Sequence, residues 1–148
     1  MTKIQREGGF FIAKIHHLAG RIFARKLKEH HLDEINPSQG RILFVLWQND
    51  DISIQELANR TSLGKSTLTS MLDRLEKAGY LTRILSREDR RETLIKLTAK
   101  TKVLHEVYVQ VSNEMTELFY SGFGTAEIND FESYLRRIFS NLTAFEKK

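Results

Sequence analysis

Residues 53–98 read SIQELANRTSLGKSTLTSMLDRLEKAGYLTRILSREDRRETLIKLT, and this stretch decides the fold. Ser53 and Glu56 have the spacing of a capping box, which predicts a short helix that ends in a turn at residues 61–64. Leu and Met side chains then recur at helical spacing, which predicts a second helix over residues 65–78 with a glycine directly after it. Two short helices joined by a tight turn are typical of a helix–turn–helix.

The pattern changes after the second helix. Residues 80–85 and 92–97 are rich in residues that favour strands, and they flank a charged turn, Ser86-Arg87-Glu88-Asp89-Arg90-Arg91. This arrangement predicts a β-hairpin. A hairpin directly after a helix–turn–helix is typical of a winged helix.

The outer face of the helix over residues 65–78 and the tip of the hairpin carry side chains suited to DNA. Serine and threonine hydroxyls contact base edges or phosphates, and arginine binds guanine. An arginine on a hairpin also fits the narrow minor groove, where the negative potential is enhanced. A helix start rich in Ser and Thr is common in solvated helices too, but three arginines on the hairpin tip favour DNA. The predicted DNA-contacting residues are Lys65, Ser66, Thr67, Thr69, Ser70, Arg74, Arg87, Asp89, Arg90 and Arg91.

The flanking sequence predicts four more helices. Apolar periodicity and capping residues place them over residues 8–29, from Pro37 to Gln48 after an Asn36 cap, from a Thr98 cap to about Ser121, and from a Thr125 cap onward. The predicted fold is mainly α with a small β-hairpin wing.

The last predicted helix carries an apolar seam. Its members recur at intervals of three and four residues: Ile128, Phe131, Leu135, Ile138, Leu142 and Phe145. A seam over more than two heptads needs a helical partner. That partner is either the first helix of the same chain or a second copy, and the regularity of the seam favours a homodimer.

Charge is unevenly distributed along the chain. The net charge is +4, but residues 60–100 hold ten basic and five acidic residues, and residues 1–35 hold seven and four. Residues 36–59 and 101–148 each have a net charge of −2. A basic block inside a folded region indicates a polyanionic partner, here double-stranded DNA.

Composition excludes several other classes of protein. A chain of 148 residues with 41% hydrophobic and 28% charged residues is typical of a globular protein. The absence of cysteine excludes disulfides, thiolate metal sites and a peroxide-sensing thiol. The longest uninterrupted apolar run, Ile42 to Trp47, is too short to span a membrane. We therefore expect a cytoplasmic protein that does not bind membranes.

No enzyme or metal site is predicted. His16 and His17 are adjacent, as are His30 and His31, and adjacent residues on a helix point about 100° apart. We therefore do not expect the two rings of either pair to bind the same metal ion. The sequence has no phosphate-binding glycine loop, nucleophile motif or zinc-protease motif. We expect no cofactor and no catalytic residues.

The run from Gly64 to Leu81, followed by Ser86 to Arg91 and by Leu97-Thr98, resembles the MarR family of transcription regulators. The family's Asp-x-Arg wing motif is matched by Asp89 and Arg91. By this resemblance Arg91 is the minor-groove arginine, and Asp89 holds the wing or the neighbouring arginine in place. On an extended strand these two side chains would point the same way, so Asp89 would pair with or orient Arg91.

The resemblance also implies the organisation of the whole chain. It implies a single domain in which residues 1–35 and 99–148 form dimerisation helices and residues 36–98 form the winged helix–turn–helix lobe. The homodimer would bind a pseudo-palindromic operator as a repressor. The chain departs from the family at Thr101 and Gly64, where glycine and a polar cap respectively are common.

An effector site is implied by the same resemblance. The family often binds small aromatic or phenolic acids between the dimerisation helices and the lobe, and such a ligand would release the DNA. The candidate lining residues are Phe11, Ile15, His16, Phe44 and Trp47, although side chains of these types are more often plain core. The alternative function is a winged-helix protein-interaction module that does not read DNA sequence.

Overall fold

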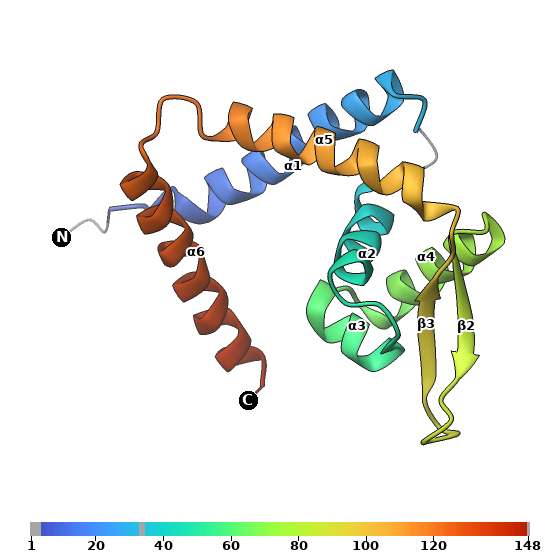
Figure 1. The fold of residues 1–148 in the computed structure, drawn as a ribbon. Helices are drawn as coiled ribbons and strands as arrows, with labels where there is room; N and C mark the ends of the chain where they lie inside the picture. Colours follow the sequence, from blue (N-terminus) through green and yellow to red (C-terminus); the bar gives the residue numbers. More distant parts are fainter. Residues whose placement is uncertain (1–3, 33–34, 148) are drawn as a thin grey trace. The chain divides into compact units, whose positions relative to one another are not determined.

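A computed structural model describes residues 4–32 and 35–147. The elements in chain order are α1 (Gly8–Glu29), α2 (Pro37–Gln48), β1 (Ile52–Ser53), α3 (Ile54–Thr61), α4 (Lys65–Lys77), β2 (Leu81–Leu85), β3 (Thr93–Leu97), α5 (Thr101–Phe119) and α6 (Thr125–Glu146) (Figure 1). The predicted fold class, mainly α with a small wing, is confirmed. The chain divides into two compact units within α5, one up to Ser112 and one from Asn113 onward.

The starts of α2 and α3 follow from local capping chemistry. Asn36 Oδ1 accepts a hydrogen bond from the Gln39 backbone N–H at 2.8 Å, and Gln39 Oε1 accepts one from the Asn36 N–H at 2.9 Å. At α3, Ser53 Oγ accepts from the Glu56 N–H at 3.1 Å, but the Glu56 carboxylate binds Arg60 Nε at 2.7 Å instead of returning to Ser53. The first capping box is therefore complete, and the second is half formed.

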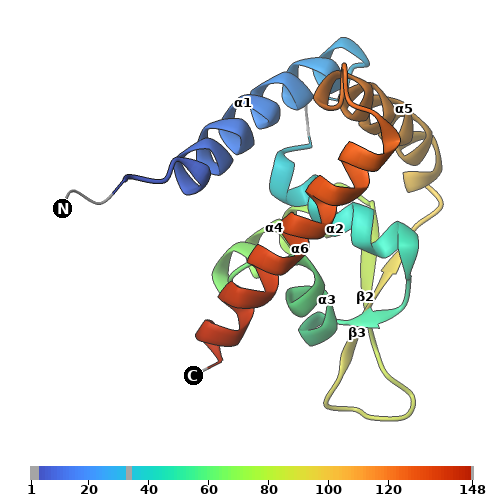
Figure 2. The same cartoon turned by 90° about the vertical axis from the view of Figure 1, so that its left-hand side faces the viewer.

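The hairpin belongs to a three-stranded sheet with the order β1-β3-β2. All neighbouring strands are antiparallel, with Leu81 opposite Leu97 in the hairpin and Ile52 opposite Ile95 across β1 and β3. The sequence predicts β2 and β3 but misses β1, because two residues are too few to show a strand period. In Figures 1 and 2 the β2–β3 hairpin extends past α3 and α4.

Two predicted helix caps are wrong. The Thr98 hydroxyl donates to the Gly79 carbonyl oxygen, and α5 begins at Thr101, whose N–H and hydroxyl both donate to the Thr98 carbonyl. At α6 the N-cap is Gly124 rather than Thr125, and its N–H donates to Glu127 Oε1 at 2.9 Å. In the first case the Thr98 side chain is held at a carbonyl 19 residues away in sequence, and the helix begins three residues after Thr98.

The core of the first unit lies between α2, α3, α4, the sheet and the start of α5. Its fully buried side chains come from each of these elements and from the end of α1: Leu27, Ile42, Leu43, Leu46, Leu57, Leu68, Leu72, Leu75, Leu81, Ile95 and Val111. None of the helices among the described residues combines the length and the apolarity needed to cross a membrane.

Gly40 allows α5 to approach α2 closely. A Cβ atom on Gly40 would lie 1.7 Å from the hydroxyl oxygen of Tyr108 and 2.7 Å from its Cζ. Tyr108 is buried and its ring contacts Phe23 of α1 and Trp47 of α2, with ring centroids 5.0 Å and 5.3 Å apart. The tyrosine therefore has little room to move away.

Gly40→Ala should lower the free energy of unfolding by about 1–3 kcal/mol, since overpacking forces the Tyr108 side chain or the backbone to shift. Thermal and urea unfolding at one protein concentration measure the change. Gly20→Ala is the matched control, because Gly20 lies inside α1 and, apart from its own helix backbone and chain neighbours, no described atom lies within 4 Å of its Cβ position. Alanine is the better helix former, so the control should be stabilised by up to about 1 kcal/mol. Equal stability of the two variants would contradict the close approach at Gly40.

The apolar seam of α6 is only partly covered. Phe131 is half-buried and its ring lies near the rings of Phe119 and Tyr120. Farther along the helix, Leu142 and Phe145 are 65% and 77% exposed. A row of large apolar side chains exposed on one helix is costly in water, so this seam needs a cover.

Candidate nucleic-acid interface

α3 and α4 are held together by a buried turn. Thr61 is buried, and its hydroxyl donates to the Leu57 carbonyl at 2.8 Å and accepts from the Leu63 N–H at 3.4 Å. Ser62 adopts a left-handed conformation with φ 57°, which reverses the chain between the helices. The turn thereby fixes the direction of α4 relative to α3.

Packing of the inner face of α4 leaves its outer face exposed. Leu68, Leu72 and Leu75 are buried against the core. Every α4 residue predicted to contact DNA is exposed: Lys65, Ser66, Thr67, Thr69, Ser70 and Arg74. The N-cap of α4 is Gly64, which has no side chain, so no side-chain cap covers the first turn. Its backbone N–H groups and the positive end of the helix dipole are open to an anion such as phosphate.

The wing turn is held by a network of main-chain contacts. Ser86 is buried, and its hydroxyl accepts from the N–H groups of Glu88 and Asp89 at 3.2 Å and 3.3 Å. Asp89 Oδ1 accepts from the Arg91 backbone N–H at 3.0 Å. The turn closes with the Glu92 N–H donating to the Asp89 carbonyl at 3.0 Å.

This geometry corrects the expected relation between Asp89 and Arg91. The two residues lie in a turn and not on an extended strand, so the rule that alternate side chains share a face does not apply. Asp89 acts on the main chain of Arg91 and holds the wing. Ser86 is a structural residue that the sequence reasoning missed, although a serine that starts a polar turn is a known turn signal.

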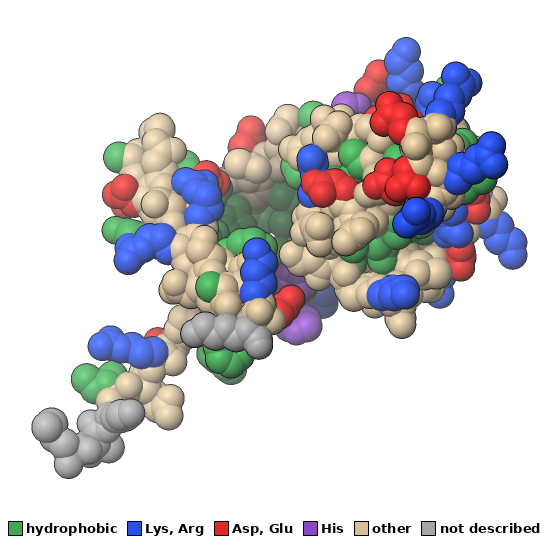
Figure 3. Space-filling model, turned by 90° about the horizontal axis from the view of Figure 1, so that it is seen from below, with side chains coloured by type: hydrophobic (Ala, Val, Ile, Leu, Met, Phe, Trp, Pro, Cys, Tyr) green, Lys and Arg blue, Asp and Glu red, His purple; other side chains and the backbone are tan. Residues whose placement is uncertain are grey.

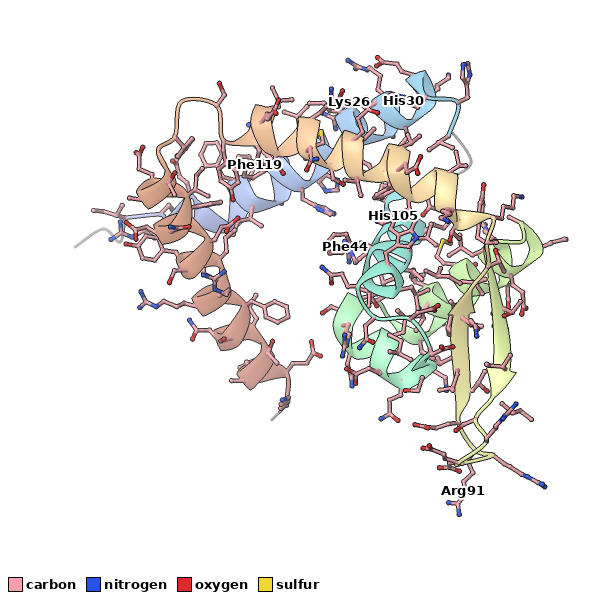
Figure 4. The ribbon with its side chains drawn as sticks, viewed as in Figure 1. Lys26, His30, Phe44, Arg91, His105 and Phe119 are labelled. Atoms are coloured by element: carbon pink, nitrogen blue, oxygen red, sulfur yellow. The ribbon has the colours of Figure 1, made fainter. Side chains whose placement is uncertain are left out.

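The three wing arginines are available to a partner. Arg87, Arg90 and Arg91 are exposed, and none of their guanidinium groups forms an ion pair with any described residue. Figure 4 shows Arg91 at the tip of the hairpin. Lys and Arg side chains lie around the edge of the lobe in Figure 3, with carboxylates among them.

A cleft joins the helix–turn–helix to the wing. It has a volume of about 660 Å³ and is lined by residues of α3, α4 and the wing, among them Gln55, Lys65, Thr69, Arg91 and Glu92. The structure therefore brings three predicted residues, Lys65, Thr69 and Arg91, onto one surface. Ser70, Arg74, Arg87 and Arg90 are exposed but lie outside the lining of this cleft.

Residues 35–93, which span this helix–turn–helix and most of the wing, match the model of the MarR family. The chain carries a MarR-family domain. The curated relatives include the HTH-type transcriptional regulators TtmR of Methylorubrum extorquens, 39% identical over 60% of this chain and 44% of that protein, and FarR of Neisseria gonorrhoeae, 34% identical over 57% and 56%. The chain thus spans about half the length of these relatives. The transcriptional repressor IacR of Pseudomonas putida is 26% identical over 90% and 78%.

Solved structures share the fold of the MarR-family domain and its flanking helices. A MarR protein from Peptoclostridium difficile has a TM-score of 0.87 and 22% identity, with 100% of this chain and 96% of that chain covered. Streptococcus pneumoniae FabT in complex with DNA has a TM-score of 0.76, 21% identity and coverage of 93% and 96%. PcaV of Streptomyces coelicolor, in complex with its natural ligand, has a TM-score of 0.79, 18% identity and coverage of 95% and 98%.

An aromatic cluster forms between α2, which lies within the MarR-family domain, and α5. The Trp47 ring stacks on His105 at 4.7 Å between centroids and contacts Tyr108, whose phenol pKa is raised by burial. Trp47 Nε1 is buried and has no hydrogen-bond partner among the described residues. Sequence reasoning missed His105 and Tyr108, although Tyr108 lies four residues after Leu104 and three before Val111, which are both buried.

The other candidate ligand residues are exposed. Phe44 lies on α2 and is 50% exposed (Figure 4). Phe11, Ile15 and His16 are exposed on α1, where the Phe11 ring lies near Phe10 and near Lys14 Nζ, and the His16 ring lies near His17. Within residues 4–32 and 35–147, no three His, Cys, Asp or Glu side chains gather as a metal site would require.

Proposed function

We propose that this chain is a DNA-binding transcription regulator that binds a pseudo-palindromic operator as a homodimer. The observation that carries the proposal is the common surface formed by Lys65 and Thr69 of α4 with Arg91 of the wing. In this arrangement α4 is the recognition helix in the major groove, and the wing reaches the adjacent minor groove. The names of the relatives and the DNA complex of FabT support the same function.

The homodimer would use the helices outside the lobe. We assign residues 1–35 and 99–148 to dimerisation and residues 36–98 to DNA binding. The exposed seam of α6 supports this assignment, as do the exposed apolar side chains of α1, which include Phe11 and Ile15. A twofold dimer presents two lobes, which matches the symmetry of an inverted repeat.

The regulator would be a repressor that a small aromatic or phenolic acid releases from DNA. The site for this effector would be the cluster of Trp47, His105 and Tyr108, with Phe44, three residues before Trp47 on α2, as a further candidate. The buried Trp47 N–H has no partner among the described residues and would donate to a carboxylate or phenol that enters the cluster, and the rings offer stacking surfaces. The ligand complex of PcaV and the repressor IacR are consistent with this mode of regulation.

A gel shift with fragments from the region upstream of the chain's own gene tests the function. Fragments that contain the operator should be retarded at both low and moderate salt, while unrelated fragments of equal length should be released as salt rises, since non-specific binding is largely electrostatic. Equal retardation of all fragments would favour an incidental basic surface on a protein-interaction module.

Thr67→Ala should relax the preference at one position of each half-site. Thr67 and Thr69 are expected to face base edges, whereas Arg74 lies nearer the rim and contacts a base or phosphate. Removal of a base contact costs about 1–3 kcal/mol of discrimination. Titrations with operators mutated at single positions measure this change. If both the affinity and the selected consensus are unchanged in Thr67→Ala, the assigned orientation of α4 in the groove is wrong.

A further inference from the structure

Arg83 of β2 is tied to α4 by two carboxylates. Arg83 Nη2 lies 2.6 Å from Asp73 Oδ1, and the Arg83 backbone N–H donates to Glu76 Oε2 at 3.2 Å. Asp73 and Glu76 are three residues apart on α4, so they lie on the same side of the helix. Both the side chain and the main chain of the strand are thereby attached to one side of α4.

The environment of Arg83 indicates a fixed side chain. Its side chain is 27% exposed, and Nε is buried without a partner among the described residues. Arg83 also lies opposite Ile95, which is fully buried, in the β2–β3 ladder. The guanidinium is therefore held by its surroundings and directed at Asp73, which is itself 59% exposed.

The ion pair joins the two parts of the proposed DNA-binding surface. α4 carries the side chains for the major groove, and β2 leads directly into the turn that carries Arg91. The Arg60–Glu56 ion pair lies within α3, whereas the Asp73–Arg83 ion pair connects α4 to β2. Major-groove and minor-groove contacts form together only when the spacing between helix and wing suits the DNA.

We propose that Asp73 and Arg83 are positioning residues that set the orientation of the wing relative to α4, and thereby the affinity for the operator, without touching DNA. This inference rests on the proposed DNA-binding function. An exposed ion pair contributes little to global stability. It can still raise affinity by holding the two contact elements in the bound arrangement before DNA arrives, which lowers the cost of ordering them on binding.

The direction in which Asp73→Asn changes the affinity for the operator distinguishes a positioning role from a purely electrostatic one. Asp73→Asn removes a negative charge near DNA, so electrostatics alone predicts tighter binding. Positioning predicts the opposite, a loss of about 3- to 10-fold in affinity for the operator. Arg83→Gln should weaken binding by a similar factor, and the double variant Asp73→Asn/Arg83→Gln should be no weaker than either single variant, since the pair is already broken.

The experiment is a binding titration of the full-length protein with operator and with random DNA at several salt concentrations, after circular dichroism has shown folded variants. Glu56→Gln is the matched control, because it removes one carboxylate from an exposed ion pair within α3. We expect the control to bind operator at least as tightly as the wild type. We expect Asp73→Asn to weaken operator binding while its affinity for random DNA stays the same or rises.

Two results would overturn the inference while the wild type still binds the operator. One is an Asp73→Asn variant with wild-type or tighter affinity for operator. The other is an Arg83→Gln variant whose salt slope falls by about two for the dimer, which would mean that Arg83 itself contacts phosphate. A wild type that binds no DNA sequence selectively would overturn the proposed function and this inference with it.

Discussion

An Arg91→Ala dimer should lose most of its affinity for the operator. Arg91 is exposed at the wing tip, and the Asp89 carboxylate fixes its main chain while leaving the guanidinium without an ion pair among the described residues. A guanidinium is less strongly hydrated than an ammonium, so it enters a narrow groove at lower cost. A loss of about 1–3 kcal/mol per half-site corresponds to at least about 30-fold for a symmetric dimer.

Two further variants identify the kind of interaction that Arg91 makes with DNA. Arg91→Lys should recover only part of the affinity. Arg90→Ala should cost less and should lower the salt slope by about one for each phosphate that Arg90 neutralises in the wild type, or about two for the dimer. The variants are titrated across salt after circular dichroism and sedimentation have shown intact, folded dimers. Wild-type affinity of a folded Arg91→Ala dimer at every salt concentration would mean that the wing does not reach the groove.

The double variant Leu135→Asp/Ile138→Asp should sediment as a monomer at concentrations where the wild type is a dimer. Leu135 and Ile138 are 37% and 42% exposed in the single chain and lie in the middle of the α6 seam. Burial of two charges in an apolar interface costs several kcal/mol each. Sedimentation velocity at micromolar concentration measures the change.

Ser133→Asp/Ser140→Asp is the matched control for the dimer seam. Both serines line one surface of α6 with Arg136 and Arg137, and none of these residues belongs to the seam. The control adds the same two charges and should remain dimeric. A wild type that sediments as a monomer, or a seam variant that stays dimeric, would show that the seam of α6 is not the dimer interface.

Local chemistry explains why much of the fold is predictable from sequence. The Asn36 and Ser53 caps use partners three residues away, so α2 and α3 begin where the sequence predicts. Contacts distant in sequence explain the errors. β1 exists only because it pairs with β3, and the Thr98 side chain is held at the Gly79 carbonyl while α5 begins at Thr101.

In the candidate interface, too, local sequence predicts some features and contacts distant in sequence decide the others. Helical periodicity predicts which side chains of α4 are exposed, because the leucine stripe must face the core. The partner of Asp89 depends on the exact shape of the wing turn, and the Asp73–Arg83 pair depends on how β2 lies against α4. The contact between Gly40 and Tyr108 joins residues 68 positions apart, which a pattern within one helix cannot indicate.

Selection of bound fragments from random DNA tests the proposed function most directly. It reports both whether the protein recognises a DNA sequence and whether two lobes bind with the spacing of a dimer. We expect an enriched inverted repeat whose half-site centres lie one helical turn, about 10–10.5 base pairs, or a multiple of it apart. We also expect the enrichment to disappear with Arg91→Ala. Selected fragments with no common sequence, or with a single unpaired half-site, would contradict a dimeric regulator that reads DNA through α4 and the wing.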